Sequence, residues 1–423
     1  MGFAARLTQE GHPTRMWIRN PDARSVGDRI VDKVGDFEDF LVGAEPATDV
    51  FIFDTSGNGV MADYAKREGF AVLGGSVLAD RLERDRTFGA SIMQGADIDV
   101  PETLSFTSFE EGIRHVEENP DVRWVYKPSK QLGDLSPSHV SYDAEDLIEM
   151  LENISKEVDI ADLQFELQAF EKGVALSTEL WFQNGDYIPP LTNHTLERKE
   201  LMNEDIGPSG GCLGNVVWFC QGCTACDIAK RLIPWAQRVR YHGMLDLNVI
   251  VTKTGQVYGL EFTPRFGYDA SPTLFWELVK GGLGGFFADA ARGQVSQLDL
   301  RDDFAAALRV TISPWPTEKY QAEENVPIRG IDDKTLERGC YLYNVKQDDA
   351  GNLCSAGGWG IICLFTAHSS NPVRCFQSPL DACRTLRLKN KQYRTDLAKR
   401  FAEDMEALEA AGVHVNAGVE EMA

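Results

Sequence analysis

Short apolar runs along the first 80 residues alternate with amphipathic stretches, a pattern that predicts strands and helices in turn. Residues 2–10 have helical spacing, whereas 16–18 and 50–53 are apolar runs of strand length. The run at 50–53 ends in DTSGNG, and AVLGGS at 71–76 repeats this arrangement. Open α/β sheets bind ligands in loops of this kind, at the carboxyl ends of strands. The pattern therefore predicts an N-terminal α/β unit.

The middle of the chain predicts helices first and strands afterwards. Residues 81–123 have mostly helical spacing, and the strand WVYKPSK then brings Lys127 to its end. Apolar residues spaced three and four apart after Asp143 predict an amphipathic helix. Residues 163–183 predict two strands around a turn, and 184–220, which include GPSGGCLGN, are expected to be rich in loops.

The sequence LDLNVIVTKTGQVYGLEF predicts a β-hairpin that turns at a Thr-Gly pair. Apolar side chains alternate with polar ones on its first strand, whose polar face carries Asp246 and Asn248. On the second strand, Glu261 is expected to share a face with Gly259 and Thr263. A suitable pairing would bring Asp246 or Asn248 close to Glu261. After a linker, strands such as GGWGIICLFTA and a closing acidic helix predict a further α/β unit.

Charge and composition narrow the functional classes. Among 423 residues, 65 are acidic and 42 basic, which gives a formal net charge of −23. This balance argues against duplex nucleic acid as a partner, because neutralising phosphates requires a basic face, yet it allows a nucleotide substrate. No apolar run reaches the length of a membrane span, the start lacks an apolar signal region, and the nine cysteines are scattered. We therefore expect a cytoplasmic protein with reduced thiols.

Glu261 ends an apolar strand, in LEFTPRFG, where an unpaired carboxylate would be costly. One interpretation is a hard cation such as Mg²⁺, which takes one or two protein oxygens and completes its shell with phosphate and water. Arg265 would then face the same phosphates. The other interpretation is a structural ion pair between Glu261 and Arg265.

Two further features are candidates for binding an anion. Lys127 is either a phosphate ligand or a surface lysine. The glycines of 207–214 would let backbone N–H groups approach an anion.

The motif CQGCTAC places Cys220, Cys223 and Cys226 three residues apart, with Cys212 nearby. Such thiols form a zinc site, an iron–sulfur site, or no metal site at all. Three sulfurs on one regular helix do not converge on one ion, and the motif lacks the proline or distant fourth cysteine that usually accompanies a cluster. We therefore expect buried or free thiols that need no metal.

Taken in order, these segments resemble the ATP-grasp ligases, in particular the phosphoribosylamine–glycine ligase family. VYKPSK is similar to the family's phosphate-binding strand, ELQAFEKGVALS to its adenine-binding hinge, and NEDIGPSGGCLGN to its D-x-G-x-x-T-G-G-M-G loop. GMLDLNVIV and GLEFTPRFG resemble its metal-bearing hairpin. The resemblance implies an α/β ATP-grasp fold with a Rossmann-like N-terminal domain at 1–80, whose opening strand is absent or lies upstream. An ATP-grasp domain at 81–302, with a flap at about 124–182, and a small C-terminal α/β domain at 303–423 would follow.

The same resemblance implies roles for residues of this chain. ATP is expected to contact Arg86 (a lysine in the family), Lys127, Gln168, Ala169 and Phe170. The substrates are expected to contact Asp205, Gly210, Gly211 and Arg265, and the catalytic residues would be Arg265 and Lys127. Mg²⁺ or Mn²⁺ would be held by Glu261, Asn248 and Thr263.

The reaction that this resemblance implies joins glycine to 5-phosphoribosylamine, uses ATP, and passes through an acyl phosphate. Its partners would be small molecules, not duplex nucleic acid or membranes, and the protein would be a monomer or homodimer. Three departures from the family leave alternatives open. Thr263 replaces a metal-binding asparagine, Ala175 stands near the position of a ribose-binding glutamate, and KQLGDLSPSH at 130–139 replaces a glycine-rich flap. The alternatives are an ATP-grasp ligase for another carboxylate and amine in modified-nucleotide metabolism, and a degenerate, non-catalytic nucleotide-binding protein.

Overall fold

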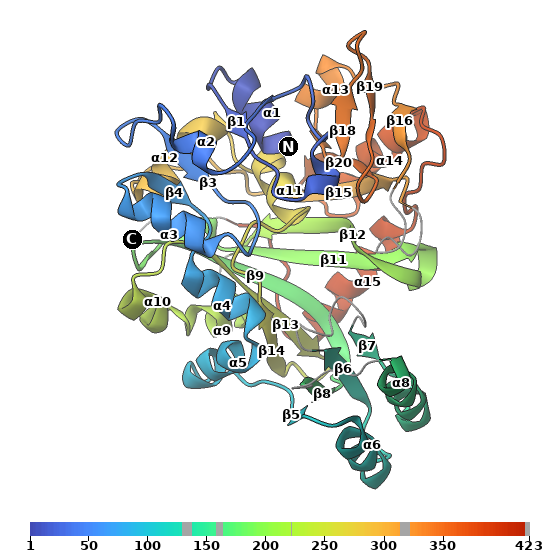
Figure 1. Cartoon of the computed structure of the whole chain (residues 1–423). Helices are drawn as coiled ribbons and strands as arrows, with labels where there is room; N and C mark the ends of the chain where they lie inside the picture. The colour runs from blue at the N-terminus through green and yellow to red at the C-terminus, as the bar shows by residue number, and fades with distance from the viewer. Residues whose placement is uncertain (129–137, 158–163, 221, 314–321, 419–423) are drawn as a thin grey trace.

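The computed structural model describes residues 1–128, 138–157, 164–220, 222–313 and 322–418. Its centre is a nine-stranded sheet in the order β14–β13–β9–β11–β12–β15–β20–β17, with β10 beside β9 (Figure 1). The strands of this sheet are β9 (Gly173–Gln183), β10 (Asp186–Tyr187), β11 (Asn193–Met202), β12 (Ile206–Phe219), β13 (Gly243–Thr252), β14 (Val257–Phe262), β15 (Phe304–Thr311), β17 (Cys340–Leu342) and β20 (Ile361–Ser369).

Two apolar cores lie on opposite faces of this sheet, because successive side chains of a strand point to opposite sides. On β12, Val216 and Trp218 belong to one core, whereas Val217 and Phe219 belong to the other. The first core is covered by α5 (Arg86–Gly95), α9 (Thr224–Lys230), α10 (Ile233–Val239), α14 (Gln377–Thr385) and α15 (Leu397–Ala410). The second is covered by α1 (Gly2–Gln9), α11 (Ala270–Glu277) and α12 (Leu283–Arg292).

The N-terminal region has the alternating pattern that the sequence predicts. Its strands form two parallel pairs, β1 (Arg15–Met16) with β2 (Asp32–Lys33) and β3 (Val50–Ile52) with β4 (Ala71–Leu73). Its helices, after α1, are α2 (Glu38–Leu41), α3 (Gly59–Arg67) and α4 (Val77–Arg84). The strand expected at 16–18 begins one residue earlier and ends at Met16.

A small four-stranded sheet, in the order β5–β8–β6–β7, stands apart from the large sheet and carries two helices (Figure 1). Its elements are β5 (Thr103–Phe106), α6 (Phe109–Glu118), β6 (Trp124–Pro128), β7 (His139–Val140), α8 (Ala144–Glu157) and β8 (Phe165–Ala169). The amphipathic helix is confirmed, because Leu147 and Leu151 of α8 are fully buried and Asp143 accepts a hydrogen bond from the N–H of Asp146. The expected flap at 124–182 corresponds to this sheet, but β9 belongs to the nine-stranded sheet.

One expectation about the second half of the chain is wrong. The region 184–220 is mainly strand rather than loop, because β11 and β12 form a long antiparallel pair. The glycine-rich part of β12 lies where the register between the two strands shifts. The α/β unit expected from residue 303 onward contributes to the central sheet, because β15 pairs with β12, and its bounds as a domain stay a prediction. Its remaining elements are the three-stranded sheet of β16 (Glu324–Pro327), β19 (Leu353–Ala356) and β18 (Val345–Gln347), and α13 (Asp333–Glu337). Among the helices of the described residues, none has the length and apolar character needed to span a membrane.

Candidate active site

The hairpin of β13 and β14 carries the polar cluster that its alternation predicts. Asn248 and Glu261 face each other in register, and a one-residue bulge at Leu260 follows this pair. The bulge turns Gly259 toward the core, where an added Cβ would lie 2.5 Å from the sulfur of Met93. The expectation that Gly259 shares a face with Glu261 is therefore wrong, since an unrecognised bulge reverses the alternation.

Asp246 completes this cluster. Its Oδ2 accepts hydrogen bonds from the hydroxyls of Ser177, at 2.9 Å, and of Thr263, and Nδ2 of Asn248 donates to Thr263 Oγ1 at 3.1 Å. Oδ1 of Asp246 is buried without a hydrogen-bond partner among the described residues. Burial raises the pKa of Asp246 and the charge of Glu261 adds to this effect, while the two hydroxyls oppose it. The cluster thus concentrates oxygen donors and negative charge.

Arg265 does not pair with Glu261. Its Nε donates to Oε1 of Glu83, on α4, at 3.1 Å, and its guanidinium lies 4.3 Å from the ring centre of Tyr268. Burial alone would lower the pKa of Arg265, but the charge of Glu83 raises it. Glu261 is exposed and has no ion-pair partner in the described part of the chain. The interpretation of Glu261 as half of an ion pair with Arg265 is therefore wrong.

A group of positive side chains forms where β6 ends. Burial lowers the pKa of Lys127. The charge of Glu261 raises this pKa, and the charges of Arg86 and Lys199 lower it further, so all three side chains lie within electrostatic range of the Lys127 ammonium group. Nη1 of Arg86, the first residue of α5, donates to the carbonyl oxygen of Pro128 at 2.5 Å. Lys127 is half-buried and, among the described residues, has no ion-pair partner. A half-buried lysine beside two other cations suits a phosphate ligand.

The hinge expected to receive adenine links the small sheet to the large one. The N–H of Ala169 donates to the carbonyl of Glu102 and that of Phe170 to the carbonyl of Arg123, each at 2.8 Å. The guanidinium of Arg123 lies 4.0 Å from the Phe170 ring centre, and Nε2 of Gln168 donates to a threonine hydroxyl of β5. These contacts hold the hinge in place, and its contact with adenine stays a prediction.

The glycine-rich segment lies on β12, where the register with β11 shifts. Gly207 and Gly211 have φ values of +90° and +84°, which residues with a side chain rarely adopt. The carbonyl of Gly210 accepts a hydrogen bond at 2.8 Å from Nη1 of Arg309. Arg309 is itself held by Asp269 through two buried hydrogen bonds, of 2.8 and 2.7 Å.

Asp205 lies just before this segment and is occupied by three arginines. It forms ion pairs with Arg394 at 2.8 Å, Arg400 at 2.5 Å and Arg198 at 3.3 Å. The side chain of Arg394 is fully buried. The contacts tie the glycine-rich segment to the end of the chain, so Asp205 has a structural role here, and its role in substrate binding stays a prediction.

Glu197, on β11, interacts electrostatically with several of these groups. Burial raises its pKa, Asp269 and Asp246 add to the shift, and Lys199 and Arg309 oppose it. Asp246 of the hairpin, Lys199, and the pair of Asp269 and Arg309 that supports the glycine-rich segment therefore lie within electrostatic range of this one side chain. The expected flap segment at 130–139 lies, as far as residue 137, outside the described residues.

Glu179 is a buried carboxyl paired in register with Asp246. Burial, reinforced by Asp246, raises its pKa to about 8, and Nε1 of Trp181 donates to it at 2.8 Å. Because this pKa lies above the value of 4.5 expected in the unfolded chain, protonated Glu179 stabilises the fold below pH 4.5, and the stabilisation is lost as the pH rises toward 8.

We therefore expect the free energy of unfolding of the metal-free protein to fall between about pH 5 and about pH 8, and Glu179→Gln to reduce that fall. Urea unfolding of both proteins at the two pH values measures the difference. Equal pH dependence in the two proteins would show that Glu179 is ionised in the folded state.

Comparison with known proteins agrees with this arrangement. No model of a known protein family matches the chain. It is 23% identical over 376 residues to a bifunctional purine biosynthetic protein of Pichia angusta, a match that covers 84% of this chain and 46% of that protein, so the chain spans about half of it. It is 24% identical over 357 residues to phosphoribosylamine–glycine ligase of Leifsonia xyli, which covers 80% of this chain and 81% of that one.

The structure of the chain is also similar to solved structures. The crystal structure of phosphoribosylamine–glycine ligase from Thermotoga maritima matches with a TM-score of 0.71 and 17% identity, and covers 93% of this chain and 96% of that one. The small sheet, the hinge, the glycine-rich strand and the polar hairpin occur in the order that the sequence predicted. The chain therefore has the ATP-grasp fold of phosphoribosylamine–glycine ligase, and its sequence is similar to the sequences of these ligases.

Proposed function

We propose that the protein is an ATP-dependent carboxylate–amine ligase that joins glycine to 5-phosphoribosylamine. The observation that carries this proposal is the approach of two opposite clusters: Lys127 and Arg86 supply positive charge beside Glu261 and Asn248, which supply oxygen ligands. A nucleotide triphosphate with its metal ion needs both. The ligase of Leifsonia xyli, which is similar to the chain over 81% of its own length, carries this name.

The hairpin fits a divalent cation. Mg²⁺ prefers oxygen ligands, and the cluster contains an exposed carboxylate at Glu261 and a buried carboxylate oxygen without a partner at Asp246. Glu261 and Asn248 would hold Mg²⁺ or Mn²⁺, with Asp246 and Thr263 beside them. When bound, the ion supplies positive charge to the phosphate oxygens of ATP.

The expected reaction has two steps and needs no protein nucleophile. A carboxylate oxygen of glycine attacks the γ-phosphorus of ATP, the bond to the bridging oxygen breaks, and ADP leaves. The amine then attacks the carbonyl carbon of the acyl phosphate, and phosphate leaves as the amide forms. Lys127 and Arg86 hold the phosphates, Arg265 adds positive charge beside the hairpin, and catalysis is positional and electrostatic.

The proposed function predicts that the protein binds Mg·ATP. A ligand that binds only the folded state raises stability by mass action, by about 2.7 kcal/mol at a hundred-fold excess over its Kd. We expect Mg·ATP to raise the melting temperature of the protein and Lys127→Met to abolish the rise. Lys389→Met, which removes an exposed lysine paired with Glu323, is the control and should keep it. No rise with the unsubstituted protein would favour a non-catalytic protein.

The substrates are tested by ADP release in the presence of Mg·ATP. We expect ADP release to continue beyond one equivalent per chain only when glycine and phosphoribosylamine are both present, and mass spectrometry to detect their amide. ADP release with a different carboxylate and amine would contradict the glycine proposal and support the ligase for modified-nucleotide metabolism, which the change to Thr263 favours.

A further inference from the structure

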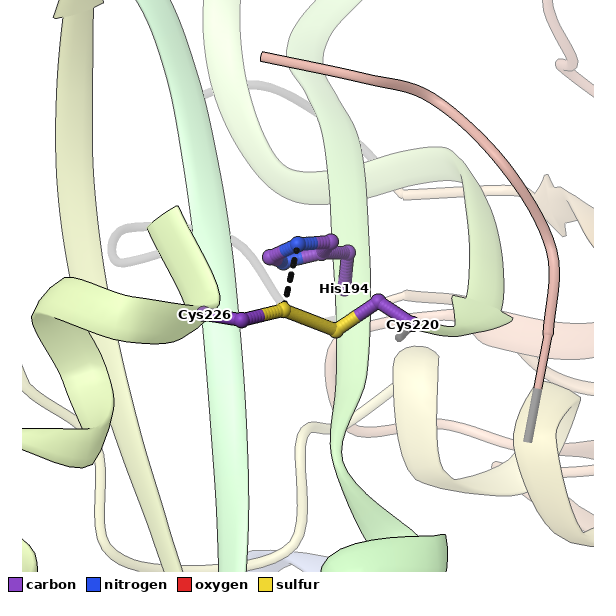
Figure 2. A group of neighbouring side chains, drawn as sticks. All are labelled: His194, Cys220 and Cys226. Carbon is purple, nitrogen blue, oxygen red and sulfur yellow. Dashed lines mark hydrogen bonds between the residues drawn. A yellow bond between two sulfur atoms is a disulfide. The ribbon is translucent and has the colours of Figure 1, made fainter. Parts of the chain in front are cut away.

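The motif CQGCTAC lies outside the proposed active site, at the junction of β12 and α9. All three of its cysteines are buried: Cys220 follows β12, Cys223 is the N-cap of α9, and Cys226 lies in its first turn. The sequence predicted buried or free thiols. Burial is confirmed, but Cys220 and Cys226 are joined by a disulfide and so are not free (Figure 2).

A histidine far away in the sequence completes this group. His194, on β11, is fully buried, and Figure 2 shows its ring against the sulfur of Cys226. Its Nε2 lies 3.0 Å from Sγ of Cys223 and 3.3 Å from Sγ of Cys226. Sγ of Cys223 and Sγ of Cys226 are 3.3 Å apart. The ligand atoms of His194, Cys220 and Cys226 all lie within 4.8 Å of one another.

The other ring nitrogen of His194 is already occupied. Its Nδ1 lies 2.9 Å from the hydroxyl of Thr178 and 3.4 Å from the carbonyl oxygen of Ser177. A proton on Nδ1 donated to that carbonyl leaves the lone pair of Nε2 directed at the sulfurs. Histidines that bind metals have this second hydrogen bond, which sets the tautomer and the orientation of the ring.

Both objections that the sequence raised against a metal site fail in the structure. The three sulfurs do not lie on one regular helix, because Cys220 is at the end of a strand and Cys223 precedes the first turn of α9. His194, which is distant in the sequence, lies beside the sulfurs in the position that a fourth ligand would need. The motif contains three potential ligands, but nothing near His194 in the sequence marks it as a fourth, since it reaches the motif only through the pairing of β11 with β12.

The spacing of the ligand atoms suits a single ion. Around a tetrahedral zinc ion, with bonds of about 2.3 Å to sulfur and about 2.0–2.1 Å to nitrogen, ligand atoms lie roughly 3.5–3.8 Å apart. The three distances given above, of 3.0 to 3.3 Å, are a little shorter, and the sulfurs of Cys220 and Cys226 would have to separate on reduction. An iron–sulfur cluster would need a wider cavity, because its inorganic core separates the thiolates. The Cα atoms of Cys220 and Cys226, 7.3 Å apart, are also farther apart than in most disulfides, which suits two thiolates that share an ion.

We propose that Cys220, Cys223, Cys226 and His194 bind one structural zinc ion when the cysteines are reduced, and that the disulfide belongs to the metal-free form. The site lies on the opposite face of the sheet from Asp246. Asn193 is in register with Glu179, which is in register with Asp246, so these three side chains share one face. His194 follows Asn193 on the same strand and therefore points to the other face. The ion would join β11, the end of β12 and α9. The proposal does not depend on the ligase activity.

The metal-free disulfide form would become the zinc-bound form in two steps, reduction of the disulfide and then binding of the ion. A phosphine reductant takes up the oxygen of one water molecule to become a phosphine oxide, and the disulfide receives two electrons and two protons to become two thiols. Zinc binding then releases the protons of the three thiols as their sulfurs bond to the ion, while neutral His194 donates its lone pair.

Elemental analysis tests the site in the full-length chain, produced in zinc-supplemented medium and purified with a phosphine reductant. We expect about one zinc per chain, as a closed four-ligand site requires. Cys223→Ser and His194→Asn should lose most of it. Cys354→Ser is the matched control, since Cys354 is a buried free thiol on β19, and should retain it.

Cobalt provides a second measurement that needs no variant. Titration of the reduced, metal-free chain with Co²⁺ should produce thiolate-to-cobalt absorption and tetrahedral ligand-field bands that saturate at one equivalent. Less than about a tenth of a zinc per chain, together with no such bands, would overturn the proposal. Stoichiometric iron with acid-labile sulfide, or loss of zinc in Cys354→Ser as well, would also overturn it.

Discussion

Replacing Glu261 by glutamine should lower the rate of ADP formation by about two to three orders of magnitude, because the variant loses the charge that holds the cation against the phosphates. The amide has the size of the carboxylate and keeps an oxygen, so geometry changes little. Folding should be unaffected. Glu261 is exposed and forms no ion pair in the described part of the chain, and Arg265 is already paired with Glu83.

Steady-state ADP release and urea unfolding of the same protein preparation measure both effects. Glu117→Gln, at an exposed position of α6, is the matched control and should retain the activity of the unsubstituted protein. A soluble Glu261→Gln protein with an unchanged rate of ADP formation would contradict the proposal that Glu261 binds the cation. A loss of several kcal/mol of stability would instead show that Glu261 has a structural partner.

Replacing Asp269 by asparagine should destabilise the protein by about 3–5 kcal/mol, because it leaves a buried guanidinium without its counter-charge. The side chains of Asp269 and Arg309 are 0% and 4% exposed, and two hydrogen bonds join them. The hydroxyl of Tyr343 donates a third hydrogen bond to Asp269, at 2.8 Å. Since Arg309 also holds the carbonyl of Gly210, the glycine-rich strand should lose its support as well.

Chemical denaturation of the purified variant measures this loss. The matched control is Asp349→Asn, because Asp349 also pairs with an arginine, Arg29, but on the surface, where its side chain is 94% exposed. Exposed ion pairs contribute about 0–1 kcal/mol, so the control should differ little from the unsubstituted protein. Equal effects of the two substitutions would contradict the importance of burial at Asp269.

Local patterns predicted those parts of the molecule whose neighbours lie nearby in the sequence. The hairpin of β13 and β14, the amphipathic helix after Asp143 and the alternating N-terminal region follow from spacing and turn residues alone. The glycines of 207–214 misled the prediction because glycine marks loops more often than strands. Here positive φ values occur within a strand, at register shifts that depend on the partner strand.

The candidate site was predictable only where its residues share an element. Asn248 and Glu261 belong to one hairpin, and Asp246 was visible beside them. Glu83 and Lys199 reach the site from α4 and β11, and no local signal marks them. The bulge at Leu260 was missed for a similar reason, since it is a property of the pairing of two strands.

The most direct test of the proposed function follows one oxygen atom. If glycine is activated as an acyl phosphate, an oxygen of its carboxylate bridges carbon and phosphorus and leaves with the phosphate when the amine attacks. With Mg·ATP, phosphoribosylamine and glycine labelled with ¹⁸O in its carboxylate, we predict that each released phosphate carries one glycine oxygen, as measured by mass spectrometry. Released phosphate that contains only oxygen from ATP and water would contradict the account.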